Sequence, residues 1–181
     1  MFEVPENAVA DDLLGDMVQI CLVTRDHKRT MDSLLRLGIG PWRVHRHHPG
    51  TTTDTRYRGQ AHSFTAVMAY AHSANIMWEV VEPVHGTGVF NEYLEQKGEG
   101  VHHVGFLCRD RSFSEAIAEF EKRGFRVAQS GRVWGGKVGF AFIDSDDALG
   151  LFFEIWDHPP GFGPPDPDEW YPAPPVGAAA T

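Results

Sequence analysis

The chain has 181 residues, of which 42% are hydrophobic and 23% charged, so it can form one compact domain or two small modules that share a core. Its formal net charge is −9 and its lysines and arginines are scattered, which excludes a nucleic-acid-binding protein. The two cysteines, Cys21 and Cys108, form no disulfide framework. The sequence shows neither a signal peptide nor an apolar run of the ~20 residues that a membrane helix needs. We therefore expect a cytoplasmic protein that acts on a small molecule.

The first half of the chain reads as an N-terminal arm, residues 1–15, and a module, residues 16–84. An apolar run over 17–24 predicts a buried strand. Asp26 is placed to cap a helix whose apolar stripe ends at Leu37, before Gly38. Three strands then follow, and the segment 47–53 between the first two is expected to be a loop. The expected strands are 42–46, 63–70 and 75–81.

The second half repeats this order after a linker. The linker, residues 85–100, predicts a short helix that Thr87 caps and Gly98 ends. The module 101–158 begins with a strand over 101–108 and continues with a helix that has a capping box from Ser112 to Glu115. Gly124 ends this helix, and the strands 126–128, 137–143 and 151–156 follow. The order β-α-β-β-β in each half predicts an α+β protein built from two tandem modules.

The C-terminal tail, residues 159–181, is rich in proline and glycine. Such a composition excludes a helix or a central strand. We expect a disordered or surface-draped end; the alternative is a strap over the site or a partner, anchored by Trp170 and Tyr171.

The two modules align at the level of single residues, and the alignment pairs four possible metal ligands. The segment from Met17 to Asp26 aligns without a gap on the segment from Val101 to Asp110, so Gln19 pairs with His103. In the same way Ile76–Pro83 aligns on Leu151–His158, so Glu79 pairs with Glu154. All four side chains can donate a lone pair to a divalent cation. A fold that faces two copies of a module together would bring them to one point.

The chain resembles the vicinal oxygen chelate superfamily, which includes glyoxalase I, methylmalonyl-CoA epimerase, extradiol dioxygenases and antibiotic-resistance proteins. The resemblance covers residues 16–158 and depends on Gly98-Glu99-Gly100-Val101-His102-His103 and on Leu151-Phe152-Phe153-Glu154-Ile155. It implies a curved mixed sheet around a metal cleft, with Gln19, Glu79, His103 and Glu154 as ligands. This ligand set is similar to that of zinc-using glyoxalase I. The epimerases and dioxygenases usually have histidine where this chain has Gln19.

The resemblance also implies the chemistry. One divalent ion, Zn²⁺ first and Ni²⁺, Co²⁺, Mn²⁺ or Fe²⁺ next, would leave two positions for a substrate with neighbouring oxygens. Glu154, and after it Glu79, would remove the proton next to a carbonyl. The period of two in strands places five further side chains around these ligands, on an apolar and aromatic pocket wall. They are Cys21, Met77, Val81, Phe152 and Trp156.

The other histidines receive simpler interpretations. His102 should point to the opposite face of its strand from His103 and be structural. His45, His47 and His48 are expected in a strand end and a solvated loop. A role for His62 or His72 as a second acid or base stays open.

Function hypotheses of three kinds follow from these patterns. A metal-dependent isomerase, epimerase or lyase fits the ligand set. A metal-free protein that sequesters a planar or cationic drug uses the same fold, and an extradiol dioxygenase is disfavoured by Gln19. We further expect a homodimer, because the fold often pairs modules between chains and the sheet edges of each half need a partner.

Overall fold

The protein is described by a computed structural model that covers residues 13–108 and 111–175. Most of the expected N-terminal arm, residues 1–15, and the last residues of the tail lie outside this range. Within the described residues the chain forms eleven strands and four helices, which confirms the predicted α+β class. The helices are α1 (His27–Leu35), α2 (Val89–Gln96), α3 (Phe113–Lys122) and α4 (Asp146–Leu149). The strands are β1 (Met17–Val23), β2 (Trp42–His47), β3 (Thr53–Tyr57), β4 (Gln60–Ala61), β5 (Thr65–Ser73), β6 (Ile76–His85), β7 (Gly100–Leu107), β8 (Val127–Val133), β9 (Val138–Ile143), β10 (Phe152–Asp157) and β11 (Glu169–Tyr171).

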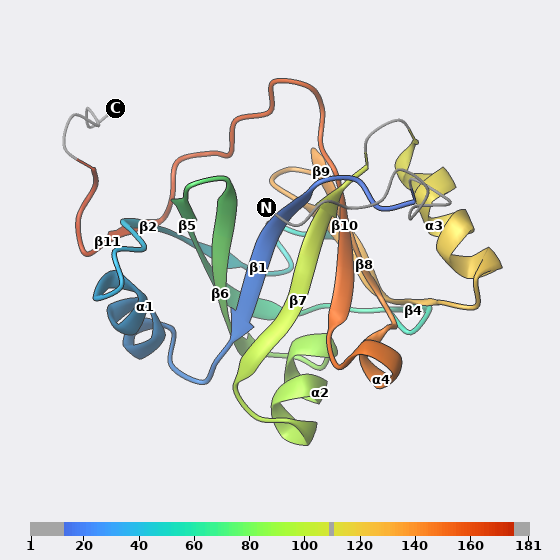
Figure 1. Cartoon of the computed structure of the whole chain (residues 1–181), viewed down its shortest axis with the longest axis horizontal. Helices are drawn as coiled ribbons and strands as arrows, with labels where there is room; N and C mark the ends of the chain where they lie inside the picture. The colour runs from blue at the N-terminus through green and yellow to red at the C-terminus, as the bar shows by residue number, and fades with distance from the viewer. Residues whose placement is uncertain (1–12, 109–110, 176–181) are drawn as a thin grey trace, which may run out of the picture.

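All these strands belong to one sheet with the order β11-β2-β5-β6-β1-β7-β10-β9-β8-β3-β4. The first strands of the two halves, β1 and β7, lie antiparallel at its centre. The last strand of each half pairs with the first strand of the same half in parallel, β6 with β1 and β10 with β7. This order places the four strands with the predicted ligands next to one another (Figure 1).

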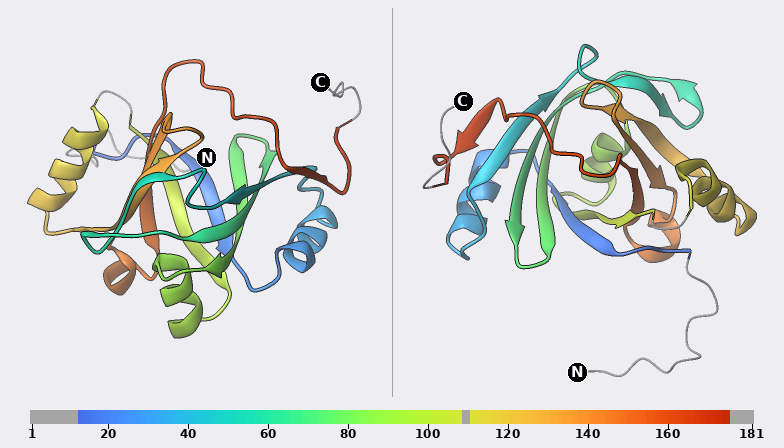
Figure 2. Two further views of the ribbon diagram at one scale, coloured as in Figure 1. Left: turned by 180° about the vertical axis from the view of Figure 1, so that it is seen from behind. Right: turned by 90° about the horizontal axis from the view of Figure 1, so that it is seen from above.

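The sheet curls into an open cup (Figure 2). Its two surfaces carry three apolar clusters. One cluster fills the inside and includes side chains of β1, β5, β6, β9 and α2. A second lies outside, where Met31 and Leu34 of α1 pack against β2, β5 and β6. A third lies outside the other half, where Ala116 and Phe120 of α3 pack against β9 and β10. The cup therefore has an apolar interior of its own, separate from the packing of the helices.

Local sequence signals explain the ends of α1 and α3. Asp26 caps α1 by accepting a hydrogen bond from the backbone nitrogen of Arg29, as predicted. Ser112 and Glu115 form the predicted capping box of α3. Gly124, with φ of +85°, follows α3 in the left-handed conformation that glycine adopts without strain. Helix α1 ends two residues before the predicted Leu37.

The predicted cap of α2 was wrong. Gly88 occupies the N-cap position, and no side chain of the helix segment caps it. Instead, the backbone nitrogen of Val89 donates a hydrogen bond of 3.0 Å to Oε1 of Gln129, on β8 of the other half. A side chain distant in sequence thus does what Thr87 was expected to do.

Two edges of the sheet differ from expectation. His47 belongs to β2 rather than to a loop, and the polar segment after it forms a hairpin, β3 and β4, that pairs with β8. The tail is draped over the surface, and its strand β11 adds to the edge of β2. Between β10 and β11 the tail crosses the open side of the cup (Figure 2). Strands β11 and β3–β4 extend the two halves beyond β2 and β8, so the sheet ends in the short strands β11 and β4.

Candidate metal centre

The four predicted ligands lie together inside the cup. Gln19 extends from β1, Glu79 from β6, His103 from β7 and Glu154 from β10. Gln19 and His103 are 0% exposed, and both glutamates are 4% exposed. Carboxylates are almost never buried to this degree without a partner. The structure thus brings the four side chains to one buried point.

Nε2 of His103 is the atom at which the other three side chains meet. It lies 3.2 Å from Oε2 of Glu79, 3.2 Å from Oε2 of Glu154 and 3.4 Å from Oε1 of Gln19. Nε2 of Gln19 donates a hydrogen bond of 3.0 Å to Oε2 of Glu79. One imidazole nitrogen carries at most one proton and cannot satisfy three oxygens. A cation among these atoms could interact with all three oxygens and with the nitrogen, so the donor set fits a divalent ion.

Burial and mutual charge shift the pKa values within the cluster. Burial by itself lowers the pKa of His103, but Glu154 and Glu79 outweigh it and raise this pKa to about 9. Burial raises the pKa of Glu154, and Glu79 raises it further, although His103 opposes both effects. Nε1 of Trp156 also donates a hydrogen bond to Oε2 of Glu154. The two carboxyl groups therefore favour a positive charge at this point, and a divalent ion can supply it.

Gly105 makes the close approach of these side chains possible. It lies two residues after His103 on β7 and is opposite both Gln19 and Glu154 in the register of the sheet. A Cβ at this position would lie 2.6 Å from Oε1 of Gln19 and 3.4 Å from Oε2 of Glu154. No side chain fits there without moving a ligand. The sequence signal for this role is a glycine inside a predicted strand, two residues from a candidate ligand. A glycine at such a position often marks the close approach of another group to the backbone.

His102 does not point away from the site, so the expectation of strict alternation was wrong. Leu22 pairs with Val101 and Cys21 with His103, which leaves His102 as the extra residue of a β-bulge. His102 is fully buried, and its Nδ1 lies 2.9 Å from Nδ1 of His103. In this contact one nitrogen donates and the other accepts. In the neutral form of His103 whose Nδ1 donates this hydrogen bond, Nε2 has a free lone pair, which faces Gln19, Glu79 and Glu154.

A small cavity opens beside the two carboxylates. Its volume is about 30 Å³, more than the ~10–15 Å³ that one water molecule needs. Trp156 is the predicted wall residue that lines it, whereas Cys21, Val81 and Phe152 are buried in the surrounding interior cluster and Met77 packs against that cluster. The lining is otherwise aromatic and apolar. It consists of Phe64, Met68, Tyr70, Phe90, Val133, Trp134, Val138, Phe140 and Phe142, with Glu79 and Glu154.

The rim of the cup contains two histidines that were expected in a solvated setting. His45 and His47 are 5% and 2% exposed, because β2 turns both toward the interior. Their rings lie 5.9 Å and 6.0 Å from the ring of Trp134, whose backbone φ is +50°. Phe162 of the tail stacks on Trp134 from outside, with ring centroids 5.5 Å apart. Burial lowers the pKa of both histidines to about 4.

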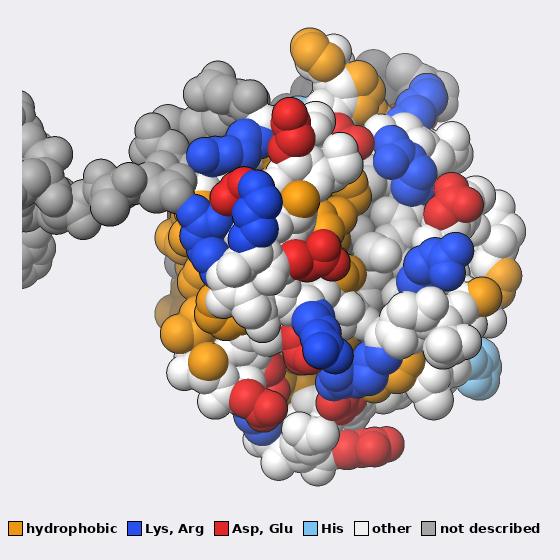
Figure 3. Space-filling view, turned by 90° about the vertical axis from the view of Figure 1, so that its right-hand side faces the viewer, with side chains coloured by type: hydrophobic (Ala, Val, Ile, Leu, Met, Phe, Trp, Pro, Cys, Tyr) orange, Lys and Arg blue, Asp and Glu red, His pale blue; other side chains and the backbone are white. Residues whose placement is uncertain are grey.

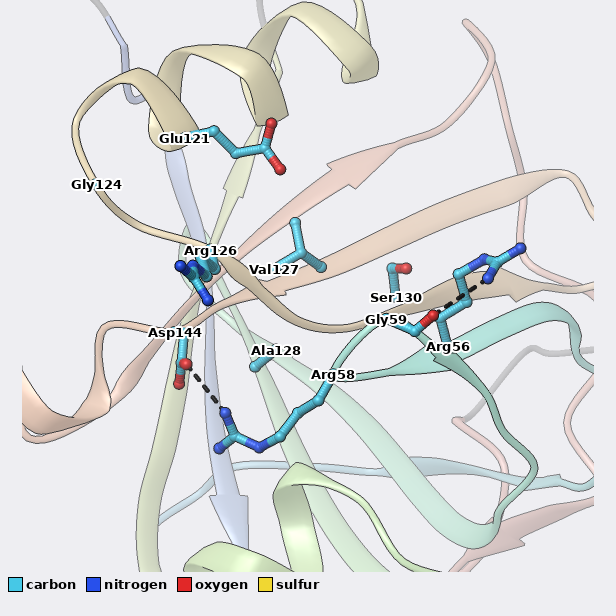
Figure 4. A pocket seen from close by; sticks show the side chains of 10 residues that line it. All are labelled: Arg56, Arg58, Gly59, Glu121, Gly124, Arg126, Val127, Ala128, Ser130 and Asp144. Carbon is cyan, nitrogen blue, oxygen red and sulfur yellow. Dashed lines mark hydrogen bonds and ion pairs between the residues drawn. The ribbon is translucent and has the colours of Figure 1, made fainter.

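A wider groove lies on another side of the molecule, between the β3–β4 hairpin and the end of α3 (Figure 4). Arg58 in this groove forms ion pairs with Glu92 and Asp144, which neutralise it. On the face that carries α3, basic and acidic side chains alternate around hydrophobic ones (Figure 3). This face has no broad basic patch for nucleic acid. No helix among residues 13–108 and 111–175 is long and apolar enough to cross a membrane.

Comparison with known proteins identifies the family. The model of the Glyoxalase/Bleomycin resistance protein/Dioxygenase superfamily matches residues 18–142. The chain belongs to this superfamily, which confirms the resemblance stated from the two sequence motifs. The uncharacterized protein YqjC of Bacillus subtilis (strain 168) is 34% identical over 41 residues. That match spans 23% of this chain and 29% of YqjC.

Solved structures share the fold at low sequence identity. A hypothetical protein from Bacillus halodurans C-125 has a TM-score of 0.61 at 16% identity, over 82% of this chain and 97% of its own. Methylmalonyl-CoA epimerase from Mycobacterium tuberculosis has a TM-score of 0.59 at 16% identity, over 85% and 95%. A mutant of 4-hydroxymandelate synthase from Streptomyces coelicolor has a TM-score of 0.55 at 16% identity, over 88% and 54%. These similarities establish the fold but not the activity, which has to be inferred from the residues of the site.

Proposed function

We propose that the protein is a divalent-metal-dependent isomerase, epimerase or lyase that removes a proton next to a carbonyl group. The observation that carries this proposal is the convergence of Gln19, Glu79 and Glu154 on Nε2 of His103. These side chains come from both halves of one chain, and their burial excludes a solvated surface role.

The donor set selects the kind of ion. One imidazole, two carboxylates and an amide oxygen suit Zn²⁺ first, and Ni²⁺, Co²⁺, Mn²⁺ or Fe²⁺ next. When bound, such an ion acts as a Lewis acid that polarises a carbonyl oxygen and stabilises the negative charge that proton removal creates. The superfamily contains structural neighbours named as epimerase and synthase, which is consistent with this chemistry.

The side chains of the protein hold and move the proton. Glu154 is the proposed base, because burial raises its pKa toward the range in which a carboxylate can accept a proton and release it again. Trp156 holds Oε2 of Glu154 in place by donating a hydrogen bond. Glu79, which accepts from Gln19, is the second candidate for the base.

The walls of the cavity indicate the substrate class. Aromatic and apolar side chains surround the carboxylates, which suits an apolar acid, a thioester or an aromatic ketone. The space beside the carboxylates is narrow, so the bulk of such a molecule must displace wall side chains or lie outside the cavity.

Proton exchange tests this function across several substrate classes at once. The protein loaded with Zn²⁺ or Co²⁺ is incubated in D2O with a panel of hemithioacetals, 2-substituted acyl thioesters and aryl ketones. NMR spectroscopy should show deuterium at the carbon next to a carbonyl in at least one of them. Glu154→Gln should slow this exchange by ~10²–10⁴-fold. The matched variant Glu95→Gln, which removes an exposed carboxylate on α2, should leave it unchanged.

Full exchange activity and full metal content in both Glu154→Gln and His103→Ala would contradict the proposal. A protein that binds no metal but holds a planar aromatic drug would favour the ligand-sequestering alternative, for which the aromatic cavity is the supporting observation. Native iron together with oxygen uptake would favour the dioxygenase, which Gln19 in place of a histidine ligand opposes.

A further inference from the structure

Cys21 lies among the candidate ligands rather than in the outer wall of the pocket. It follows Gln19 by two residues on β1, so both side chains point into the cup. In the register of the sheet it is opposite Glu79 on β6 and opposite His103 on β7. Its side chain is 0% exposed. The thiol therefore stands between two of the proposed ligands, one on each neighbouring strand.

The distances in this group are those of side chains that can share an ion. Sγ of Cys21, a carboxylate oxygen of Glu79 and a ring nitrogen of His103 all lie within 4.8 Å of one another. Bonds of about 2.0–2.3 Å place two ligands on opposite sides of a zinc ion about 4.4 Å apart, and other pairs closer. The three atoms are thus close enough for side-chain rearrangement to bring them to one ion, with no more than one pair on opposite sides of it.

We propose that Cys21 is a fifth protein ligand of the ion that Gln19, Glu79, His103 and Glu154 hold. This inference rests on the proposed function, because it concerns the same ion. With the ion bound, the S–H bond of Cys21 would break, a sulfur–metal bond would form, and the proton would leave to solvent; no electron would be transferred. A buried thiol between carboxylates gives up its proton only in exchange for a positive charge, and the ion supplies that charge.

A thiolate ligand has two consequences for the site. It favours Zn²⁺ and Co²⁺ over Mn²⁺ and Mg²⁺, which prefer oxygen ligands. A fifth protein ligand would also leave one free position on a six-coordinate ion in place of two. A substrate that binds through two oxygens would then have to displace a protein ligand. Displacement of Glu154 would free the carboxylate that we propose as the base.

Cobalt substitution tests for the sulfur directly. The protein is stripped of metal, loaded with one equivalent of Co²⁺, and its absorption spectrum is recorded. A near-ultraviolet band from sulfur-to-cobalt charge transfer should appear in the wild type and in Cys108→Ser, which replaces the half-buried cysteine that follows β7. The band should be absent in Cys21→Ser, whereas the visible bands of bound cobalt remain. This spectrum does not depend on activity.

A second measurement requires no variant. X-ray absorption of the zinc-loaded wild type should show one sulfur at about 2.3 Å from the metal. Bound cobalt without a charge-transfer band, or a zinc shell of nitrogen and oxygen alone, would overturn the assignment of Cys21 and leave the metal-dependent function standing. Failure of either ion to bind at all would instead contradict the proposed function, and the fifth ligand with it.

Discussion

At the residue scale, Gly105 determines how closely the candidate ligands approach one another. Its lack of a side chain is what admits Gln19 and Glu154 to the surface of β7 beside His103. The two aligned motifs identify the four ligands by residue type, but only the register between β1, β7 and β10 shows that the glycine is part of the same site. The inward position of His102 likewise could not be predicted, because it results from a β-bulge, and apolar alternation in the sequence does not reveal a bulge.

Gly105→Ala should weaken metal binding by ten-fold or more while the protein stays folded. The added methyl group would lie 2.6 Å from Oε1 of Gln19 and push this ligand away. Gly100→Ala is the matched control on the same strand, because a Cβ there meets no atom within 4 Å. Titration against a chelator measures the affinity, and the melting curve reports folding. Equal affinities for the two variants would show that the close approach has no role.

His47 should make the protein less stable in acid. Its pKa is lowered from 6.5 to about 4, chiefly by burial, so the unfolded chain takes up a proton at higher pH than the folded one. The stabilisation is complete above pH ~6.5 and is lost as the pH falls through about 4, up to about 3 kcal/mol. The titratable groups that act on His47 are His45, Glu79, Asp168 and His48.

Urea unfolding at several pH values measures this dependence. His47→Gln should give a shallower loss of stability between pH 6.5 and 4 than the wild type, because one of the buried histidines whose pKa is lowered no longer titrates. His72→Gln, at an exposed position, is the control and should follow the wild type. Identical slopes for the His47 variant and the wild type would show that His47 is not the source.

At the scale of elements, local signals predict what local contacts form. Asp26 and the capping box of Ser112 and Glu115 mark their helices because each cap lies within a few residues of the nitrogens it satisfies. The start of α2 was not readable in this way, since its first nitrogen is satisfied by Gln129 from β8. The β3–β4 hairpin likewise depends on a distant partner strand, and its sequence is too polar to show an apolar alternation.

The tail should stabilise the open side of the cup. A chain that stops after His158 loses β11 and the stack of Phe162 on Trp134. We expect a loss in the free energy of unfolding on the order of 2 kcal/mol, or about 4–8 °C in melting temperature. Tryptophan fluorescence should shift to the red, because the ring of Trp134 becomes exposed to solvent. A chain that stops after Pro172 keeps both contacts and should melt like the wild type. Equal melting temperatures and spectra for both truncations would contradict a stabilising role of residues 159–171.

At the scale of the whole molecule, no helix within residues 13–108 and 111–175 covers the outer surface of the central strands β1 and β7. Helices α1 and α3 lie to either side of β1 and β7, and the outer surface of these central strands faces the viewer in Figure 1. Ile20 and Val104 lie side by side on this surface, half-buried, and Val101 is 40% exposed. This apolar surface supports the expected homodimer, in addition to the short edge strands β11 and β4 at which the sheet ends.

Sedimentation velocity at micromolar concentration should therefore show a dimer. Val101→Glu should shift the equilibrium toward monomer, because dimer formation would transfer the new carboxylate from water into an apolar interface that offers it no partner. Val84→Glu, at a position that is 43% exposed on β6, should keep the dimer. A wild-type protein that sediments as a monomer would refute the prediction.

The duplicated order of strands was readable because each half repeats the same apolar pattern, and with it the α+β class. The central pairing of β1 with β7 places Gln19 opposite Gly105, and from there its side chain reaches Nε2 of His103. The aromatic cavity was not readable, since much of its lining comes from β5, β8, β9 and α2, whose apolar side chains look like ordinary core residues in sequence.

Metal content tests the central claim most directly. The protein is purified without a chelator or an affinity metal, beside Glu154→Ala and the exposed-carboxylate control Glu95→Ala, and each is analysed for its elements. We expect about one divalent ion per chain in the wild type and in the control, zinc before any other, and a large loss in Glu154→Ala. No bound metal in the wild type, even after reconstitution with Zn²⁺, Ni²⁺, Co²⁺, Mn²⁺ and Fe²⁺, would contradict the four-ligand centre and the proton-transfer function built on it.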